Sequence, residues 1–125
     1  MSSIKSYKEL IVWQKSISLV KEIYKLTNNF PQSEIYGLSS QMRRAAVSIP
    51  SNIAEGYARK SSREYSQFYS IAYGSLLELE TQLTIARDLK FGNINSYNDI
   101  ESLVNEVSRM LHVMIIKIGQ LNPKR

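Results

Sequence analysis

The sequence predicts an all-α protein, an antiparallel up-down-up-down four-helix bundle that forms one domain over residues 1–125. Apolar residues recur at three- and four-residue steps through four segments, which is the spacing of a helix face. Hydrophobic residues make up 43% of the 125 residues, enough for a chain of this length to bury one core. Short connections separate the segments, and such connections make consecutive helices antiparallel neighbours. We expect helices over residues 7–29, 35–59, 62–89 and 97–121.

The first helix carries two apolar stripes. Ser6 and Glu9 fit a capping box at its start, and Phe30 before Pro31 ends it, because the residue preceding a proline avoids the helical region. One stripe consists of Leu10, Trp13, Ile17, Val20 and Tyr24. The other consists of Val12, Leu19, Ile23, Leu26 and Phe30. Two stripes indicate two buried surfaces, so one is available for an interface between molecules. The alternative is a single wide core face.

The second helix departs furthest from an ordinary amphipathic pattern. Pro50 lies inside it, and proline removes a backbone donor and crowds the preceding turn, so we expect a kink there. Gly56 weakens its last turns. Its core stripe is Leu38, Met42, Ala45, Ile49 and Ile53.

The third and fourth helices have the most regular seams. Ser61 and Glu64 form a second candidate capping box. Gly74 interrupts the third helix at a cost of about 1 kcal/mol relative to alanine, which indicates a close approach of another helix. The seam of the third helix is Tyr69, Ala72, Leu76, Leu79, Leu83 and Ala86. That of the fourth is Ile100, Val104, Val107, Leu111, Met114, Ile118 and Leu121, and Gly119 and then Pro123 close this helix.

The composition favours a cytoplasmic protein with an anionic partner. There are no cysteines, no run of about 20 apolar residues and no signal-peptide pattern at the N-terminus, so we expect neither disulfides nor a membrane partner. The formal net charge of +5 suits RNA or DNA, because lysine and arginine displace counterions from phosphate. A merely soluble basic protein is the alternative.

Catalytic chemistry is not expected, and neither is a cofactor or a metal. A di-iron bundle requires Glu-x-x-His pairs, but the only histidine, His112, follows Arg109 at that spacing and lies off the seam. Glu78 and Glu80 are two residues apart and point to different sides of a helix, so they cannot share a site. We therefore expect a protein that is not an enzyme.

The best binding candidate is the segment 57–73, where cations alternate with tyrosines that could stack on bases. The alternative is that Tyr65 and Tyr69 are edges of the core. The residues expected to contact phosphate are Arg43, Arg44, Arg59, Lys60 and Arg63.

Three segments of this chain resemble a known family. They are YKELIVWQKSISLVKEIYKLT at 7–27, LSSQMRRAAVSIPSNIAEGYAR at 38–59 and GSLLELETQLTIARDL at 74–89. They are similar to the bacterial four-helix-bundle 23S rRNA intervening-sequence proteins, once labelled S23 ribosomal proteins. That family also includes the accessory variability determinant of diversity-generating retroelements.

The resemblance implies a cytoplasmic bundle assembled as a ring-like homopentamer, with no enzyme activity or cofactor. In the retroelement branch it implies binding of nucleic acid and of a reverse transcriptase. Two functions follow as hypotheses: RNA or DNA binding without sequence reading, and an adaptor oligomer whose ligand is another protein.

Overall fold

The computed structural model describes residues 6–121, with the side chains described as far as Lys117. Its elements are two short 3-10 turns, η1 and η2, and four α-helices, as the sequence predicts. No strand occurs in the described range. The bounds are η1 Tyr7–Glu9, α1 Ile11–Thr27, η2 Gln32–Glu34, α2 Leu38–Tyr57, α3 Ser62–Asp88 and α4 Ser96–Leu121.

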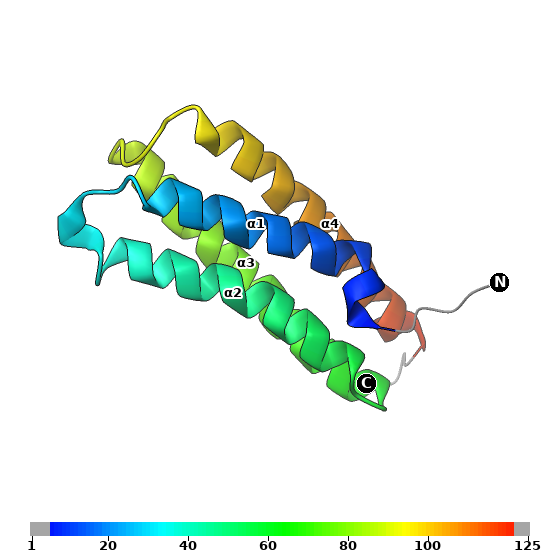
Figure 1. Cartoon of the computed structure of the whole chain (residues 1–125). Helices are drawn as coiled ribbons and strands as arrows, with labels where there is room; N and C mark the ends of the chain where they lie inside the picture. Colours follow the sequence, from blue (N-terminus) through cyan, green and yellow to red (C-terminus); the bar gives the residue numbers. More distant parts are fainter. Residues whose placement is uncertain (1–5, 122–125) are drawn as a thin grey trace.

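The four helices pack in a cycle. Helix α2 contacts α1 and α3, and α4 contacts α3 and α1, whereas α1 and α3 share no contact within the described residues. Figure 1 shows the chain running from end to end of the bundle with each helix. The α1–α2 and α3–α4 connections lie at one end. The start of α1, the α2–α3 turn and the end of α4 lie at the other.

The helix expected over residues 7–29 is divided in two. Ser6 caps η1 by accepting a 3.1 Å hydrogen bond from the Lys8 backbone N–H. Leu10 then adopts an extended conformation, and α1 begins only at Ile11. The Gln14 side chain donates to the Lys8 carbonyl at 2.9 Å and folds η1 against the start of α1. The capping pattern therefore marks a separate turn.

The helix expected over residues 35–59 is shorter, and it starts at Leu38. The Glu34 carboxylate accepts a 3.1 Å hydrogen bond from the Leu38 N–H, which supplies a cap from the preceding turn. Pro50 is buried inside α2, and the helix is continuous through it. The kink expected at Pro50 stays a prediction.

Only one of the two stripes of α1 lies in the core. Val12, Leu19, Ile23 and Leu26 are buried, whereas Trp13, Ile17 and Val20 are half-buried and Tyr24 is 45% exposed. The seams of α3 and α4 are buried from Tyr69 to Ala86 and from Ile100 to Leu111. The side chains of Ile118 and Leu121, and Pro123, lie outside the described residues. The stripe along Trp13 therefore lies at the edge of the core, where Trp13 and Val20 pack against it, and stays partly exposed in this single chain.

Within a single chain, the expectation about Gly74 is wrong. A Cβ atom built on Gly74 would have nothing within 4 Å, so no helix of this chain approaches it closely. The close approach occurs at Gly56, where a Cβ atom would lie 2.7 Å from the Tyr69 ring. Gly56 therefore sets the separation of α2 and α3 near their shared turn.

Candidate nucleic-acid interface

The structure separates the five candidate cations into two groups. Arg43 and Arg44 lie in the first half of α2, whereas Arg59, Lys60 and Arg63 surround the α2–α3 turn. Fifteen residues separate Arg44 from Arg59, which corresponds to about 22 Å along a helix. A single phosphate group cannot contact both groups.

Arg43 is engaged within the bundle. Its Nε donates a 2.8 Å hydrogen bond to Thr27 Oγ1, and its Cζ lies 4.8 Å from the centroid of the Tyr24 ring. Thr27 in turn donates from Oγ1 to the Ile23 carbonyl at 2.8 Å. Arg43 therefore ties α2 to the end of α1, and its role here is structural.

Arg59 is also held by its own chain. Its Nη2 lies 2.9 Å from Glu55 Oε2, and its Cζ lies 4.6 Å from the centroid of the Phe68 ring. The Glu55 carboxylate offsets the charge of the guanidinium. Arg59 Nε is buried and has no hydrogen-bond partner among the described residues. This arginine packs the α2–α3 turn and adds little uncompensated charge.

Lys60 and Arg63 are exposed, and neither forms an ion pair with a described residue. Between them Ser61 caps α3. Its Oγ accepts from the Glu64 N–H at 3.2 Å, which is the first half of the predicted capping box. The Glu64 carboxylate accepts from the Ser61 hydroxyl at 3.1 Å, whereas a capping box would pair it with the Ser61 backbone N–H. The carboxylate of Glu64 is thus held at the first turn of α3, where its negative charge stabilises the positive end of the helix dipole.

Two further exposed cations lie at the same end of the bundle. Lys8 belongs to η1 and Lys117 to the last turns of α4, and no described ion pair involves either of them. We call this set the basic end: Lys8, Lys60, Arg63 and Lys117. The opposite end carries exposed Asp88 and Asp99, together with a salt bridge between Arg87 and Glu101. Exposed Lys90 also lies at the opposite end, and exposed Glu9 and Glu64 lie at the basic end. The basic end still has more exposed cations than exposed carboxylates, whereas the opposite end does not.

The row of tyrosines does not form a surface on which bases could stack. Tyr69 is 6% exposed, and burial raises the pKa of its hydroxyl above the usual value. Tyr65 is half-buried and stacks on Tyr69 with ring centroids 6.5 Å apart. Tyr73 packs 6.2 Å from the ring of His112. These rings belong to the packing of the bundle, which was the alternative interpretation.

The remaining polar residues are dispersed. His112 is exposed, as expected from its place off the seam. Glu78 lines a hollow between α2 and α3, whereas Glu80 lines one between α3 and α4, so the two carboxylates face different sides. Within the described part of the chain, no group of three acidic, histidine or cysteine side chains is placed to hold a metal ion.

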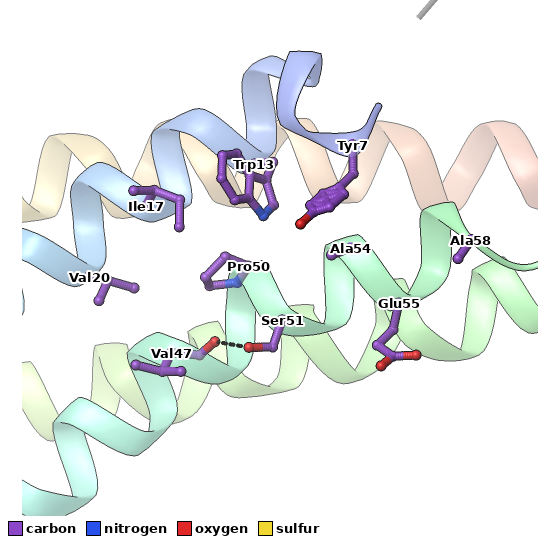
Figure 2. A pocket seen from close by; sticks show the side chains of 10 residues that line it. All are labelled: Tyr7, Trp13, Ile17, Val20, Val47, Pro50, Ser51, Ala54, Glu55 and Ala58. Carbon is purple, nitrogen blue, oxygen red and sulfur yellow. Dashed lines mark hydrogen bonds between the residues drawn. The ribbon is translucent and has the colours of Figure 1, made fainter. Parts of the chain in front are cut away.

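Two neighbouring hollows lie along α2, on the side that faces α1 and the α1–α2 connection. One of about 530 Å³ is lined by Trp13, Ile17 and Val20 from α1 and by Pro50 and Ala54 from α2. Figure 2 shows these side chains facing one another across the gap. The second hollow, of about 590 Å³, continues toward the α1–α2 connection and shares Val47 with the first. We call the two together the α1/α2 groove. In the sequence, the second apolar stripe of α1, which contains Trp13, Ile17 and Val20, indicates this groove.

Comparison with known proteins locates the chain in one family. No described helix is long and apolar enough to cross a bilayer. No curated protein matches the chain. Its fold is similar to that of a crystal structure from Bacteroides thetaiotaomicron, a protein of unknown function from the S23 ribosomal protein family. The TM-score is 0.75 at 24% identity, over 84% of this chain and 98% of that one. Residues 8–113 match the 23S rRNA-intervening sequence protein family, and the chain belongs to that family.

Proposed function

We propose that this protein is a non-enzymatic, cytoplasmic oligomer that binds RNA or DNA through phosphate contacts and does not read sequence. The observation that carries the proposal is the basic end. Lys60 and Arg63 flank the α2–α3 turn without an ion pair among the described residues, and Lys8 and Lys117 lie at the same end. Cations that are not neutralised by neighbouring carboxylates are the ones able to displace counterions from a phosphate backbone.

The phosphate contacts that we propose are fewer than the five cations predicted from the sequence. Lys60 and Arg63 are the principal candidates, because Arg43 and Arg59 are held by Thr27 and Glu55. Arg44 is exposed but lies apart from the basic end. Tyr65 and Tyr69 stack on each other and Tyr73 packs against His112, so these three rings offer no free face beside Lys60 and Arg63. The mode we propose is therefore electrostatic, without base stacking.

Assembly is the second part of the proposal. The stripe of Trp13, Ile17 and Val20 is only half-buried in the single chain and lines an apolar hollow, and exposed apolar surface of this kind favours an interface. The resemblance to the intervening-sequence family implies a ring-like homopentamer. In a ring of parallel chains the basic ends gather on one face, which multiplies the charge that meets a nucleic acid.

A second candidate function is an adaptor oligomer that binds another protein, for example a reverse transcriptase. The apolar lining of the α1/α2 groove favours it, because protein partners bury apolar surface. Filter binding of mixed-sequence RNA and DNA separates the two functions. Retention at 50 mM salt that falls steeply by 300 mM supports phosphate binding. No retention of either nucleic acid at low salt would contradict it and favour the adaptor.

A further inference from the structure

We propose that the α1/α2 groove of one chain receives the outer face of α3 from a second copy, so that neighbouring chains join head to tail. This inference rests on the proposed assembly and assigns its two contact surfaces. One surface is concave and lies between two helices. The other is a single helix face on a different side of the bundle.

The groove has the shape and chemistry of a helix acceptor. Val47, Pro50 and Ala54 form its α2 side with small or compact side chains, while Trp13 and Ile17 face them from α1. Val47 is 40% exposed and lines both hollows, so the two lie next to each other along α2. Ridges of side chains on one helix pack into grooves between the side chains of others, so a depression of this kind fits a helix.

The outer face of α3 supplies a matching ridge. Ile71, Leu77 and Ile85 are each about half exposed on the helix, and Gly74 lies among them. We call these four residues the α3 ridge. Gly74 costs about 1 kcal/mol in a helix interior, yet beyond its own stretch of helix no atom of the described chain lies within 4 Å of where its Cβ would be. A helix from a neighbouring chain would account for the glycine, because its absent side chain lets the two backbones approach.

The two surfaces cannot pair within one chain. Helix α3 contacts α2 and α4 but not α1, so its outer face points away from the groove. Two different patches that bind each other form a heterologous interface, and such an interface closes into a ring when the rotation permits. A pairing of groove with groove would instead give a two-fold dimer and leave the α3 ridge uncovered.

Charge supports the same pairing. Arg44 borders the groove, and Glu78 lies beside the ridge. Both are exposed and form no ion pair among the described residues. They line one hollow between α2 and α3, so they lie at the same height along the bundle. In a ring whose axis is parallel to the bundle, a given residue of every copy lies at the same position along that axis. The Glu78 of one copy then comes level with the Arg44 at the groove of the next.

Light scattering on matched variants tests the inference. Val47→Glu places a charge in the groove, and Leu77→Glu places one on the ridge. Val113→Glu on α4 is the control, because Val113 is as exposed as Leu77 (48% and 47%) but belongs to neither surface. Circular dichroism confirms that each variant is folded. We expect the wild type and Val113→Glu to be the same closed oligomer and the other two variants to be monomers at 14.3 kDa.

Mixing the two monomeric variants gives the decisive result. The groove variant retains its ridge and the ridge variant retains its groove, so an equal mixture at high micromolar concentration forms one-to-one dimers and nothing larger. Folded variants that stay monomeric on mixing would overturn the inference, as would a Leu77→Glu variant that assembles like the wild type. A monomeric wild type would instead refute the proposed assembly itself.

Discussion

Gly56 and Tyr69 are in such close contact that a Cβ atom on Gly56 would lie 2.7 Å from the tyrosine ring. The ring is buried and the glycine lies in the last turn of α2, so neither has room to move. This contact brings α2 onto α3 next to the turn that carries Lys60 and Arg63. The position of the basic end therefore depends on a residue without a side chain.

We expect Gly56→Ala to lower the free energy of unfolding by about 1–2 kcal/mol. Overpacking costs about 1–3 kcal/mol, and alanine returns up to about 1 kcal/mol of helix propensity. Gly74→Ala is the matched control, because its new methyl group meets nothing and should stabilise the single chain by up to about 1 kcal/mol. Urea unfolding of both substitutions in a Val47→Glu background removes the contribution of assembly. Equal effects of the two would contradict the packing described here.

Tyr97 should anchor the α3–α4 connection. Its side chain is fully buried, and its hydroxyl donates a 2.7 Å hydrogen bond to the Phe91 carbonyl. Tyr97→Phe leaves that carbonyl without its partner, so we expect a loss of about 1–3 kcal/mol in urea unfolding at pH 8. A loss below 0.5 kcal/mol, on the order of a surface substitution, would show that the bond contributes little.

The same residue makes stability depend on alkaline pH. Burial disfavours the phenolate and raises the pKa of Tyr97 from 10.0 to about 12, although the nearby Arg87 lowers it in part. Because the folded pKa is the higher one, this contribution is complete below pH 10 and is lost as pH rises from about 10 toward 12. The stability difference between wild type and Tyr97→Phe should therefore narrow between pH 9 and pH 11.5. A constant difference would contradict the shift.

Arg43 should contribute to stability and not to nucleic-acid binding. Arg43→Lys keeps the charge but loses the Nε donor to Thr27 and the planar group over Tyr24. We expect about 1 kcal/mol less stability in urea and an unchanged affinity for mixed-sequence RNA. A lower affinity for RNA with an unchanged free energy of unfolding would contradict this and indicate that Arg43 contacts the nucleic acid.

The sequence predicts this fold well where one stripe defines a helix. The seams of α3 and α4 required only their spacing. The α3 seam is buried from Tyr69 to Ala86, and the α4 seam is buried from Ile100 to Leu111 and half-buried at Met114. The two stripes of α1 could not be ranked, because periodicity identifies an apolar face but not the helix that covers it. The stripe containing Leu19 entered the core, and the one containing Trp13 did not. The predicted first helix is interrupted at extended Leu10, because Ser6 caps a separate turn and α1 begins only at Ile11.

The candidate site was harder to predict, because the sequence does not show which arginines and lysines are held by other side chains of the same chain. Arg43 and Lys60 look alike in the sequence, yet Arg43 reaches across to Thr27 and Lys60 is left exposed. Lys8 and Lys117 are far apart in the sequence, and only the arrangement of the helices places them at the same end.

The sequence analysis also missed Tyr97, a core residue, because it lies one turn before the predicted seam of α4, which starts at Ile100.

The most direct test of the central claim is the salt dependence of RNA binding. Fluorescence anisotropy with mixed-sequence single-stranded RNA from 50 to 300 mM salt compares the wild type with Lys60→Gln/Arg63→Gln. The control Lys21→Gln/Lys25→Gln removes the same net charge from α1. We expect the double variant of the basic end to lower the slope of log Kobs against log salt by about 1.4 per contacting protomer, and the control to leave it unchanged. Equal slopes for the wild type and the basic-end variant would contradict the claim.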